Sequence, residues 1–160
     1  MNNKFGIFKL ALDQELELSF NNMDQEWFCS ILNELESDVD NEDKQKLSNE
    51  SKLTFSGRIT KKNDSRHKDI LLLEGNLSSE FKTYCVRSGD PMVDTLNIEV
   101  SSVFIDKALE NKYGLEEEIS LFVNDKEYDL YYLENNQADV LPVLHEYVFL
   151  NKNPYPKLEQ

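Results

Sequence analysis

The stretch Ile70–Cys85, which reads ILLLEGNLSSEFKTYC, decides the fold class of this chain of 160 residues. It is rich in apolar and aromatic residues, and its pattern predicts one long β-strand. We expect this strand to break at Glu74-Gly75-Asn76, because a glycine inside a strand weakens it and often marks a bulge or bend. Strand patterns on both sides of this segment supply its expected neighbours in a sheet.

Further strands are expected on either side of that segment. Residues 53–59 alternate between apolar and polar side chains around Gly57, and residues 96–100 alternate in the same way. Such alternation is typical of strands with one buried face. The sequence KKNDSRHKD (61–69) is the one basic-leaning stretch of the chain, and we expect it to form an exposed hairpin loop. Several strands joined by short connections are therefore predicted.

Two local patterns lie between or within these strands. Ser88-Gly89-Asp90-Pro91 predicts a turn, because glycine accepts a positive φ, aspartate bonds to nearby backbone and proline fixes φ. Val103 and Ile105 fall on the opposite parity from residues 96–100. This change of parity predicts a β-bulge near Ser101-Ser102, where one extra residue would shift the alternation.

The N-terminal part of the chain predicts a hairpin followed by a helix. Residues 5–12 form an apolar, strand-like run, and residues 15–20 alternate as a half-buried strand beyond an expected turn at Asp13-Gln14. Asn22 with a glutamine three residues later is typical of a capping box. Apolar residues at 27, 28, 31, 32 and 35 then predict an amphipathic helix over 23–36 that packs on a sheet.

The C-terminal part predicts a short helix over 106–113, a hairpin and a final helix. Residues 119–123 and the alternating residues 128–132 form the expected hairpin around a turn at Asn124-Asp125. Asp139 is the expected N-cap of the final helix, with a proline in its first turn, where proline is tolerated. The expected buried stripe of that helix is Val140, Leu144, Tyr147 and Val148.

The predicted fold class is therefore α+β. A mostly antiparallel sheet carries an N-terminal and a C-terminal helix packed on it, within a single domain that spans residues 1–160. The final helix is expected to end before Asn153-Pro154 and to be followed by an extended tail over 151–160.

The strongest bulk property is a net charge of −14, with an isoelectric point of about 4.5. Nucleic-acid binding depends on Lys and Arg that neutralise phosphates, so this charge disfavours a chain that grips RNA or DNA with its whole surface. It also disfavours anionic membranes. A basic protein is the natural electrostatic partner, although acidity also serves solubility alone. With no long apolar stretch and a poor match to a signal peptide, a cytoplasmic location is expected.

Acidic residues gather in one region. From Glu34 to Glu50 there are seven acids against two lysines, so we expect residues 36–51 to form an acidic flexible loop. Such a loop is either a solvated linker or a docking surface for a basic partner. The candidate docking residues are Glu34, Glu36, Asp38, Asp40, Glu42, Asp43, Glu116, Glu117 and Glu118.

The residues that carry reaction or metal chemistry are sparse. Cys29, His67, Cys85 and His145 are the cysteines and histidines of the chain, and none lies within four residues of another, unlike the paired ligands of structural zinc sites. Cys85 with one of the histidines would be the candidate nucleophile pair of an enzyme. Glycine-rich phosphate-binding motifs are absent from the sequence. We therefore expect a non-enzymatic protein without a cofactor or metal.

One segment of the chain has the form of a family motif. GNLSSEFKTYCVRSGDPM (75–92) has an early glycine in a strand, a C-x-R turn and then a proline that opens the outgoing strand. Cys85, Arg87 and Pro91 fall on this pattern. Ser88 stands where the motif commonly has a second cysteine, so a metal at this turn is not expected.

A second segment follows it in the right order. DVLPVLHEYVFL (139–150) begins a helix with Asp139 and places Glu146 seven residues later within an apolar run. Together the two segments resemble the YceD family, the large-subunit ribosomal RNA accumulation proteins of bacteria and plastids. The resemblance implies a role in the synthesis, processing or stability of large-subunit rRNA, in a family without assigned catalytic residues.

The resemblance and the charge together predict a partner. We expect the protein to bind a basic ribosomal protein or a ribosome assembly intermediate, and whether it contacts RNA directly stays open, as does its oligomeric state. The alternative is a small acidic secretion chaperone that binds an extended segment of an exported effector by strand addition. Such chaperones usually begin with a helix, whereas this chain is expected to begin with a strand.

Overall fold

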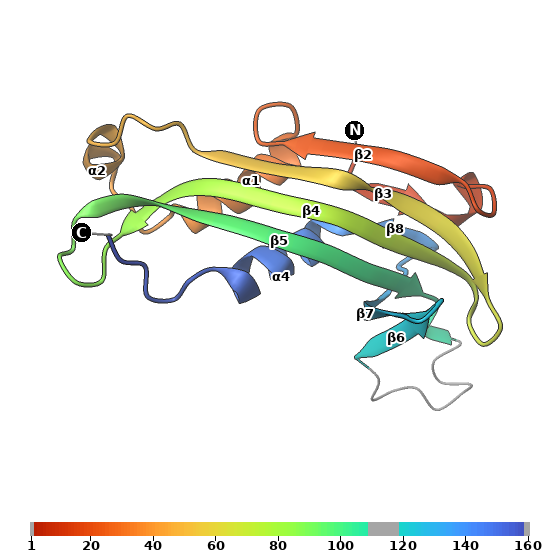
Figure 1. Cartoon of the computed structure of the whole chain (residues 1–160). Coiled ribbons are helices and arrows are strands. Elements are labelled where there is room, and N and C mark those ends of the chain that lie inside the picture. Colours follow the sequence, from red (N-terminus) through yellow and green to blue (C-terminus); the bar gives the residue numbers. More distant parts are fainter. Residues whose placement is uncertain (1, 109–118, 159–160) are drawn as a thin grey trace.

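A computed structural model describes residues 2–108 and 119–158 of the chain (Figure 1). Within these residues six strands form a sheet in the order β2-β3-β4-β5-β7-β6, and β1 pairs separately with β8. The strands are β1 (Lys4–Gly6), β2 (Glu15–Asn21), β3 (Lys52–Asp64), β4 (Lys68–Tyr84), β5 (Pro91–Ile105), β6 (Ser120–Val123), β7 (Lys126–Tyr132) and β8 (Gln137–Asp139). The helices are α1 (Glu26–Leu35), α2 (Asn41–Gln45), α4 (Val140–Asn151) and the 3₁₀ helix η1 (Ile7–Lys9).

The predicted fold class is confirmed at the level of α+β with a mostly antiparallel sheet. The pairs β2–β3, β3–β4, β4–β5 and β6–β7 are antiparallel, whereas β5 and β7 run parallel, which the sequence did not predict. α1 and α4 lie on the same face of the sheet and share its main core (Figure 1). The helix placement is partly confirmed: α1 and α4 correspond to the predicted N-terminal and C-terminal helices, whereas η1 before α1 and α2 after it were not predicted.

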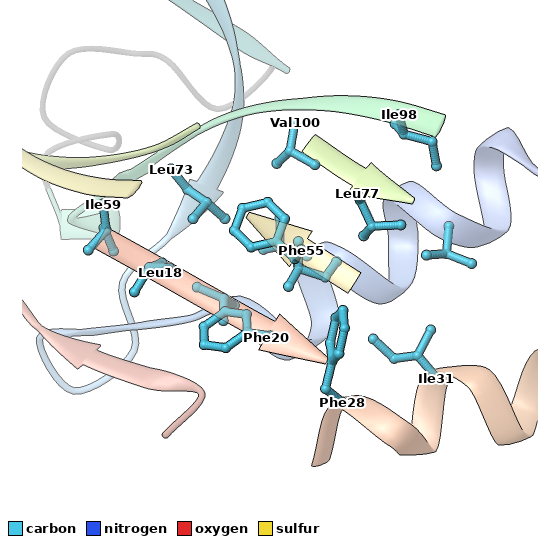
Figure 2. Close-up of a cluster of buried hydrophobic side chains, with 14 of the residues drawn as sticks. Leu18, Phe20, Phe28, Ile31, Phe55, Ile59, Leu73, Leu77, Ile98 and Val100 are labelled. Atoms are coloured by element: carbon cyan, nitrogen blue, oxygen red, sulfur yellow. The ribbon is translucent and has the colours of Figure 1, made fainter. Parts of the chain in front are cut away.

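The main core fills the space between these helices and the sheet. Phe28 and Ile31 of α1 point toward Phe20 of β2 and Phe55 of β3 (Figure 2), and the rings of Phe20 and Phe55 stack with centroids 5.8 Å apart. Leu77 is also fully buried in this cluster. Burying one such side chain contributes about 1.5–3 kcal/mol, so the amphipathic pattern of α1 is what fixes it to the sheet.

The predicted break in the long central strand is wrong. β4 runs without interruption from Lys68 to Tyr84, and Gly75 lies directly opposite Gly57 of β3. A Cβ added at Gly57 would lie 2.1 Å from the carbonyl oxygen of Glu74, and one at Gly75 would lie 2.5 Å from that of Ser56. The two glycines therefore permit a close approach of neighbouring strands, which keeps β4 continuous where a break was expected.

The predicted bulge near Ser101-Ser102 is also wrong. β4 and β5 keep one register from the Leu71–Phe104 pair to the Tyr84–Pro91 pair. The apolar residues change parity because this end of the sheet is buried on both faces. Opposite the main core, a second cluster contains Ile70, Leu72, Val103, Ile105, Leu121 and Tyr128.

The predicted N-terminal hairpin does not form. β2 pairs with β3 along its whole length, whereas β1 pairs with β8 near the other end of the chain. The apolar run 5–12 is explained by burial, because Phe5, Ile7 and Leu10 belong to the main core. The expected exposed loop 61–69 is shorter than predicted, since β3 reaches Asp64 and β4 begins at Lys68.

The start of α1 also differs from its predicted cap. Asn21 Oδ1, rather than Asn22, accepts hydrogen bonds from the N–H groups of Met23 and Asp24. Asn22 Oδ1 instead accepts a bond from the N–H of Leu53, which fixes the loop to β3. The helix consequently begins at Glu26, three residues later than expected.

The C-terminal predictions are largely confirmed. Asn124 and Asp125 both have positive φ (50° and 65°) in the turn between β6 and β7. Asp139 caps α4, its Oδ1 accepting a hydrogen bond from the N–H of Leu141 at 3.1 Å, and the helix ends at Asn151. The helix predicted over 106–113 falls mainly outside the described residues.

Candidate functional site

The first motif segment forms the turn between β4 and β5, as predicted. The N–H of Cys85 donates to the carbonyl of Asp90 at 2.8 Å, and the N–H of Gly89 donates to the carbonyl of Cys85 at 2.8 Å. Gly89 has a φ of +74°, a conformation that favours glycine. Pro91 is the first residue of β5, and Ser88 Oγ accepts a bond from the N–H of Asp90. The exposed Arg87 lies at the tip of this turn.

The C-terminal tail lies against this turn and covers Cys85. The N–H of Val86 donates to the carbonyl of the buried Pro156 at 2.9 Å, and the N–H of Leu158 donates to Cys85 Sγ at 3.4 Å. Hydrogen bonds from Ser88, and then from backbone N–H groups that include that of Leu158, lower the pKa of the buried Cys85 thiol from its ordinary value of 9.0 to about 6. The sulfur is thus a hydrogen-bonded anchor for the tail near neutral pH.

Neither histidine lies beside Cys85. His67 is buried in the turn between β3 and β4, where its Nδ1 lies 2.7 Å from Asp64 Oδ2. This turn and the Cys85 turn sit at opposite ends of β4, whose 17 residues have a contour length of about 55 Å. His145 Nε2 lies 2.7 Å from Glu34 Oε2 and so links α4 to α1. Cys85 therefore does not form the cysteine–histidine pair that was considered as a candidate nucleophile.

Glu36 is not a docking residue, which corrects the prediction for this position. It is buried, and its Oε2 accepts hydrogen bonds from the N–H of Lys82 at 2.6 Å and from Ser51 Oγ at 2.5 Å. The pairing of β3 with β4 stops at the Lys52–Glu80 pair, so Glu36 supplies the acceptor that the continuing edge of β4 needs. The predicted acidic loop is thereby fixed at its start to the sheet.

The helix α2 within that region is fixed as well. The hydroxyl of Tyr84 donates to Asp43 Oδ2 at 2.6 Å and accepts a bond from the N–H of Asp40 at 3.2 Å. The bonds from Tyr84 and then Lys46 lower the pKa of Asp43, and the same contact raises the pKa of Tyr84. The acidic region is thus held beside the β4–β5 turn.

The structure brings one group of predicted residues together. α2, the β4–β5 turn and the C-terminal tail all lie at the same end of the sheet (Figure 1). Asp38, Asp40 and Glu42 are exposed there, and we call this group the acidic end. Glu34 is exposed but contacts His145, and the predicted docking residues Glu116, Glu117 and Glu118 lie outside the described residues.

The second motif segment contributes to a different place. Asp139 caps α4 and accepts a bond from Asn3 Nδ2, which is a structural role. Glu146, further along α4, lines a cleft of about 740 Å³ between α4 and β7. The described residues that line this β7–α4 cleft are Ile119, Asp129, Leu130, Tyr131, Tyr132, Glu146, Tyr147, Leu150 and Asn151.

Two tyrosines lie beside two carboxylates in this cleft. The Tyr147 hydroxyl contacts Asp129 Oδ2, Ser102 Oγ and the carbonyl of Ser101. Burial raises the pKa of Tyr147, and the hydrogen bond to Asp129 raises it further. Burial and then the nearby charge of Glu146 raise the pKa of Tyr131. Both tyrosines therefore stay neutral at physiological pH.

Asp129 and Tyr131 were not predicted as site residues from the sequence. The segment YDLYY (128–132) carries an alternation that predicts a strand, but nothing in it indicates that β7 pairs with β5 and faces α4. The one available signal is the gathering of three tyrosines around an aspartate on a single strand.

No protein-family model matches the chain, and searches of curated proteins and of solved structures found no match. Among the described residues, no three His, Cys, Asp or Glu side chains lie close enough together to hold a metal ion. None of the described helices is both long and apolar enough to cross a membrane.

Proposed function

We propose that this protein is a cytoplasmic, non-enzymatic ribosome-biogenesis factor that supports the synthesis, processing or stability of large-subunit rRNA. It acts by binding a basic ribosomal protein or an assembly intermediate. The observation that carries this proposal is the acidic end, where Asp38, Asp40 and Glu42 lie exposed beside the motif turn of Cys85 and Arg87. The proposal also rests on the resemblance of both motif segments to the YceD family.

Electrostatics favours a basic protein over bare RNA as the direct partner. A surface with a net charge of −14 repels phosphates, whereas it accelerates encounters with a cationic protein at low ionic strength. At 0.1 M salt the electrostatic attraction between exposed charges extends over about 10 Å. Neighbouring carboxylates at the acidic end therefore attract the same cationic partner. Because Tyr84 fixes α2 to the sheet, part of this charge is presented in a defined place.

The test is affinity purification of the tagged protein from its native cell at low salt, with proteins and RNA both identified. We expect basic ribosomal proteins or a large-subunit precursor to be recovered, and recovery to fall as salt is raised. Deletion of the gene should reduce mature large subunits in sedimentation profiles. Recovery of neither, together with unchanged profiles, would refute the proposal.

A pair of variants makes the test specific to the acidic end. The variant Asp38→Asn/Asp40→Asn/Glu42→Gln removes three charges there and should reduce recovery of the partner. The control removes three exposed carboxylates elsewhere, in β2 and at the start of α1, as Glu15→Gln/Glu17→Gln/Glu26→Gln. Equal losses in both variants would point to net charge alone and against a docking surface at this end.

A second candidate function is supported by the edge of the sheet. In the described sheet β2 is one of the two edge strands and pairs only with β3, which is the kind of edge at which secretion chaperones add an extended effector segment. Light scattering that gives a tight dimer, with an exported effector as the co-purified protein, would favour this candidate. A protein that recovers ribosomal components and no exported protein would exclude it.

A further inference from the structure

The β7–α4 cleft combines apolar surface with fixed negative charge. Its described lining includes Tyr131 and Tyr147, which pack on the main-core face of the sheet, and the acidic residues Asp129 and Glu146, and none of its described lining residues is basic. Its volume of about 740 Å³ is within the range of sites that enclose a small ligand or a side chain. A ligand for this cleft must therefore match both aromatic walls and carboxylates.

The rim of the cleft carries large apolar side chains in water. Ile119 is 84% exposed and Leu150 is 74% exposed, and both line the cleft. Single exposed apolar residues are common, but apolar residues that gather at the mouth of a concave site are typical of a surface that a partner covers. The occupant should therefore carry apolar groups on either side of the group that enters.

The carboxylate of Asp129 is oriented before any ligand arrives. Tyr147 is held by Ser101, Ser102 and Asp129, so its ring position and its contact to Asp129 are fixed. Tyr131 of β7 lies close enough to Glu146 of α4 for the charge of Glu146 to add to burial in raising its pKa, so the two residues are near each other across the cleft. Each carboxylate has a second oxygen and further lone pairs, which leaves acceptors for a donor from a ligand.

These features together select a planar cation. A guanidinium offers several N–H donors in a rigid fork, pairs with carboxylates and stacks on aromatic faces, which an ammonium does less well. An anionic ligand would meet two carboxylates with no described basic residue to offset them. A neutral ligand would not use the two negative charges, whereas a cation is attracted to both.

We propose that the β7–α4 cleft binds an arginine side chain of the partner, with apolar residues beside that arginine covering Ile119 and Leu150. This inference rests on the proposed function and deepens it, because it assigns the recognition of the basic partner to one site. In this arrangement the acidic end attracts basic proteins in general, and the cleft selects a partner that carries an arginine between apolar residues.

The test uses a defined peptide, Gly-Leu-Arg-Leu-Gly-amide with fluorescein attached to its N-terminal amine, and a matched peptide in which citrulline replaces arginine. Citrulline keeps the shape of the side chain and removes its charge. Fluorescence polarisation at low salt should show that the full chain binds the arginine peptide about tenfold more tightly than the citrulline peptide, as expected for a hydrogen bond to a charged group. Equal affinity for both peptides, or binding of neither, would overturn the proposal.

Matched variants locate the binding. Glu146→Gln removes one charge from the cleft, and Glu127→Gln removes one from an exposed position of β7 that does not line it. We expect about tenfold weaker binding of the arginine peptide for the first variant and less than about twofold for the second. Equal weakening by both would overturn the proposal, and thermal melting of each variant checks that the fold is intact.

The two proposals fail in different ways. If the wild-type chain and Glu146→Gln recover the same ribosomal protein with equal affinity, the cleft proposal is wrong and the proposed function stands. If the chain binds the arginine peptide through Glu146 but recovers no ribosomal component, the cleft proposal stands and the proposed function is wrong.

Discussion

Replacing Gly75 with alanine should destabilise the protein strongly, because β3 and β4 leave no room for the added methyl group. The new Cβ would lie 2.5 Å from the carbonyl oxygen of Ser56, 2.7 Å from Gly57 Cα and 2.8 Å from Phe55 Cζ. An ordinary contact is about 3.5 Å or more, so backbone on two strands must move by about 1 Å. Overpacking of this kind costs about 1–3 kcal/mol, and backbone contacts place this site at the upper end.

The matched control is Gly6→Ala, where the new Cβ would lie 3.5 Å from Lys9 Cγ. Gly6 has a φ of −78°, which alanine adopts freely, so this variant should change the free energy of unfolding by less than about 0.5 kcal/mol. Urea unfolding is followed by the fluorescence of Trp27, the single tryptophan, which packs on Phe20 at 4.8 Å. A Gly75→Ala variant as stable as Gly6→Ala would refute the close approach of β3 and β4.

Three further predictions concern the site. The pKa of Cys85 is about 6 in the folded chain and higher in the unfolded chain. Raising the pH from 6 to 9 should therefore increase the urea midpoint of the wild type relative to that of Cys85→Ala. The control Cys29→Ala keeps Cys85 and should show the same increase in urea midpoint as the wild type. Glu36→Ala should cost about 1–3 kcal/mol by leaving buried donors unpaired, whereas Glu42→Ala on the surface should cost less than about 0.5 kcal/mol in the same assay. Tyr84→Phe should speed amide hydrogen exchange in α2 with a change of less than about 1 kcal/mol in global stability, and unchanged exchange would contradict the assigned contact.

The sequence predicted those parts of the fold in which one residue type meets one local requirement. The turn at residues 88–91 was predicted because glycine, aspartate and proline each have a separate geometric effect, and Gly89 indeed has a positive φ. The cap of α4 at Asp139 followed from the same kind of reasoning. The stripe of α1 was predicted because a helix with one buried face has a single periodicity.

The wrong predictions assumed which other elements pair with or pack against a given strand or helix. Alternation indicates a bulge only if one face of a strand is buried, and Val103 lies in a second cluster on the opposite face. The N-terminal hairpin assumed that strands adjacent in sequence pair, whereas Lys4 pairs with Asp139. Counting acids across residues 34–50 did not reveal that Glu36 is buried, because burial depends on where β3 stops pairing with β4.

The candidate site was harder to predict than the fold for a related reason. The β7–α4 cleft requires the parallel pairing of β5 with β7, and parallel pairing joins segments that are far apart in the sequence. No local pattern around Asp129 contains that information. The resemblance to a family directed attention to Glu146, but only the structure places it beside Tyr131.

The carboxylates of this acidic chain differ in whether another side chain holds them in one position by a hydrogen bond. A tyrosine hydroxyl binds Asp43 at the acidic end, and another binds Asp129 in the cleft. Asp43 shows the electrostatic effect, since the bond from Tyr84 lowers its pKa and keeps it ionised. A charge that is already ordered loses less conformational entropy when a partner binds. Selective recognition should therefore reside in the cleft, where Tyr147 holds Asp129, while the acidic end and the remaining acids contribute attraction that salt screens.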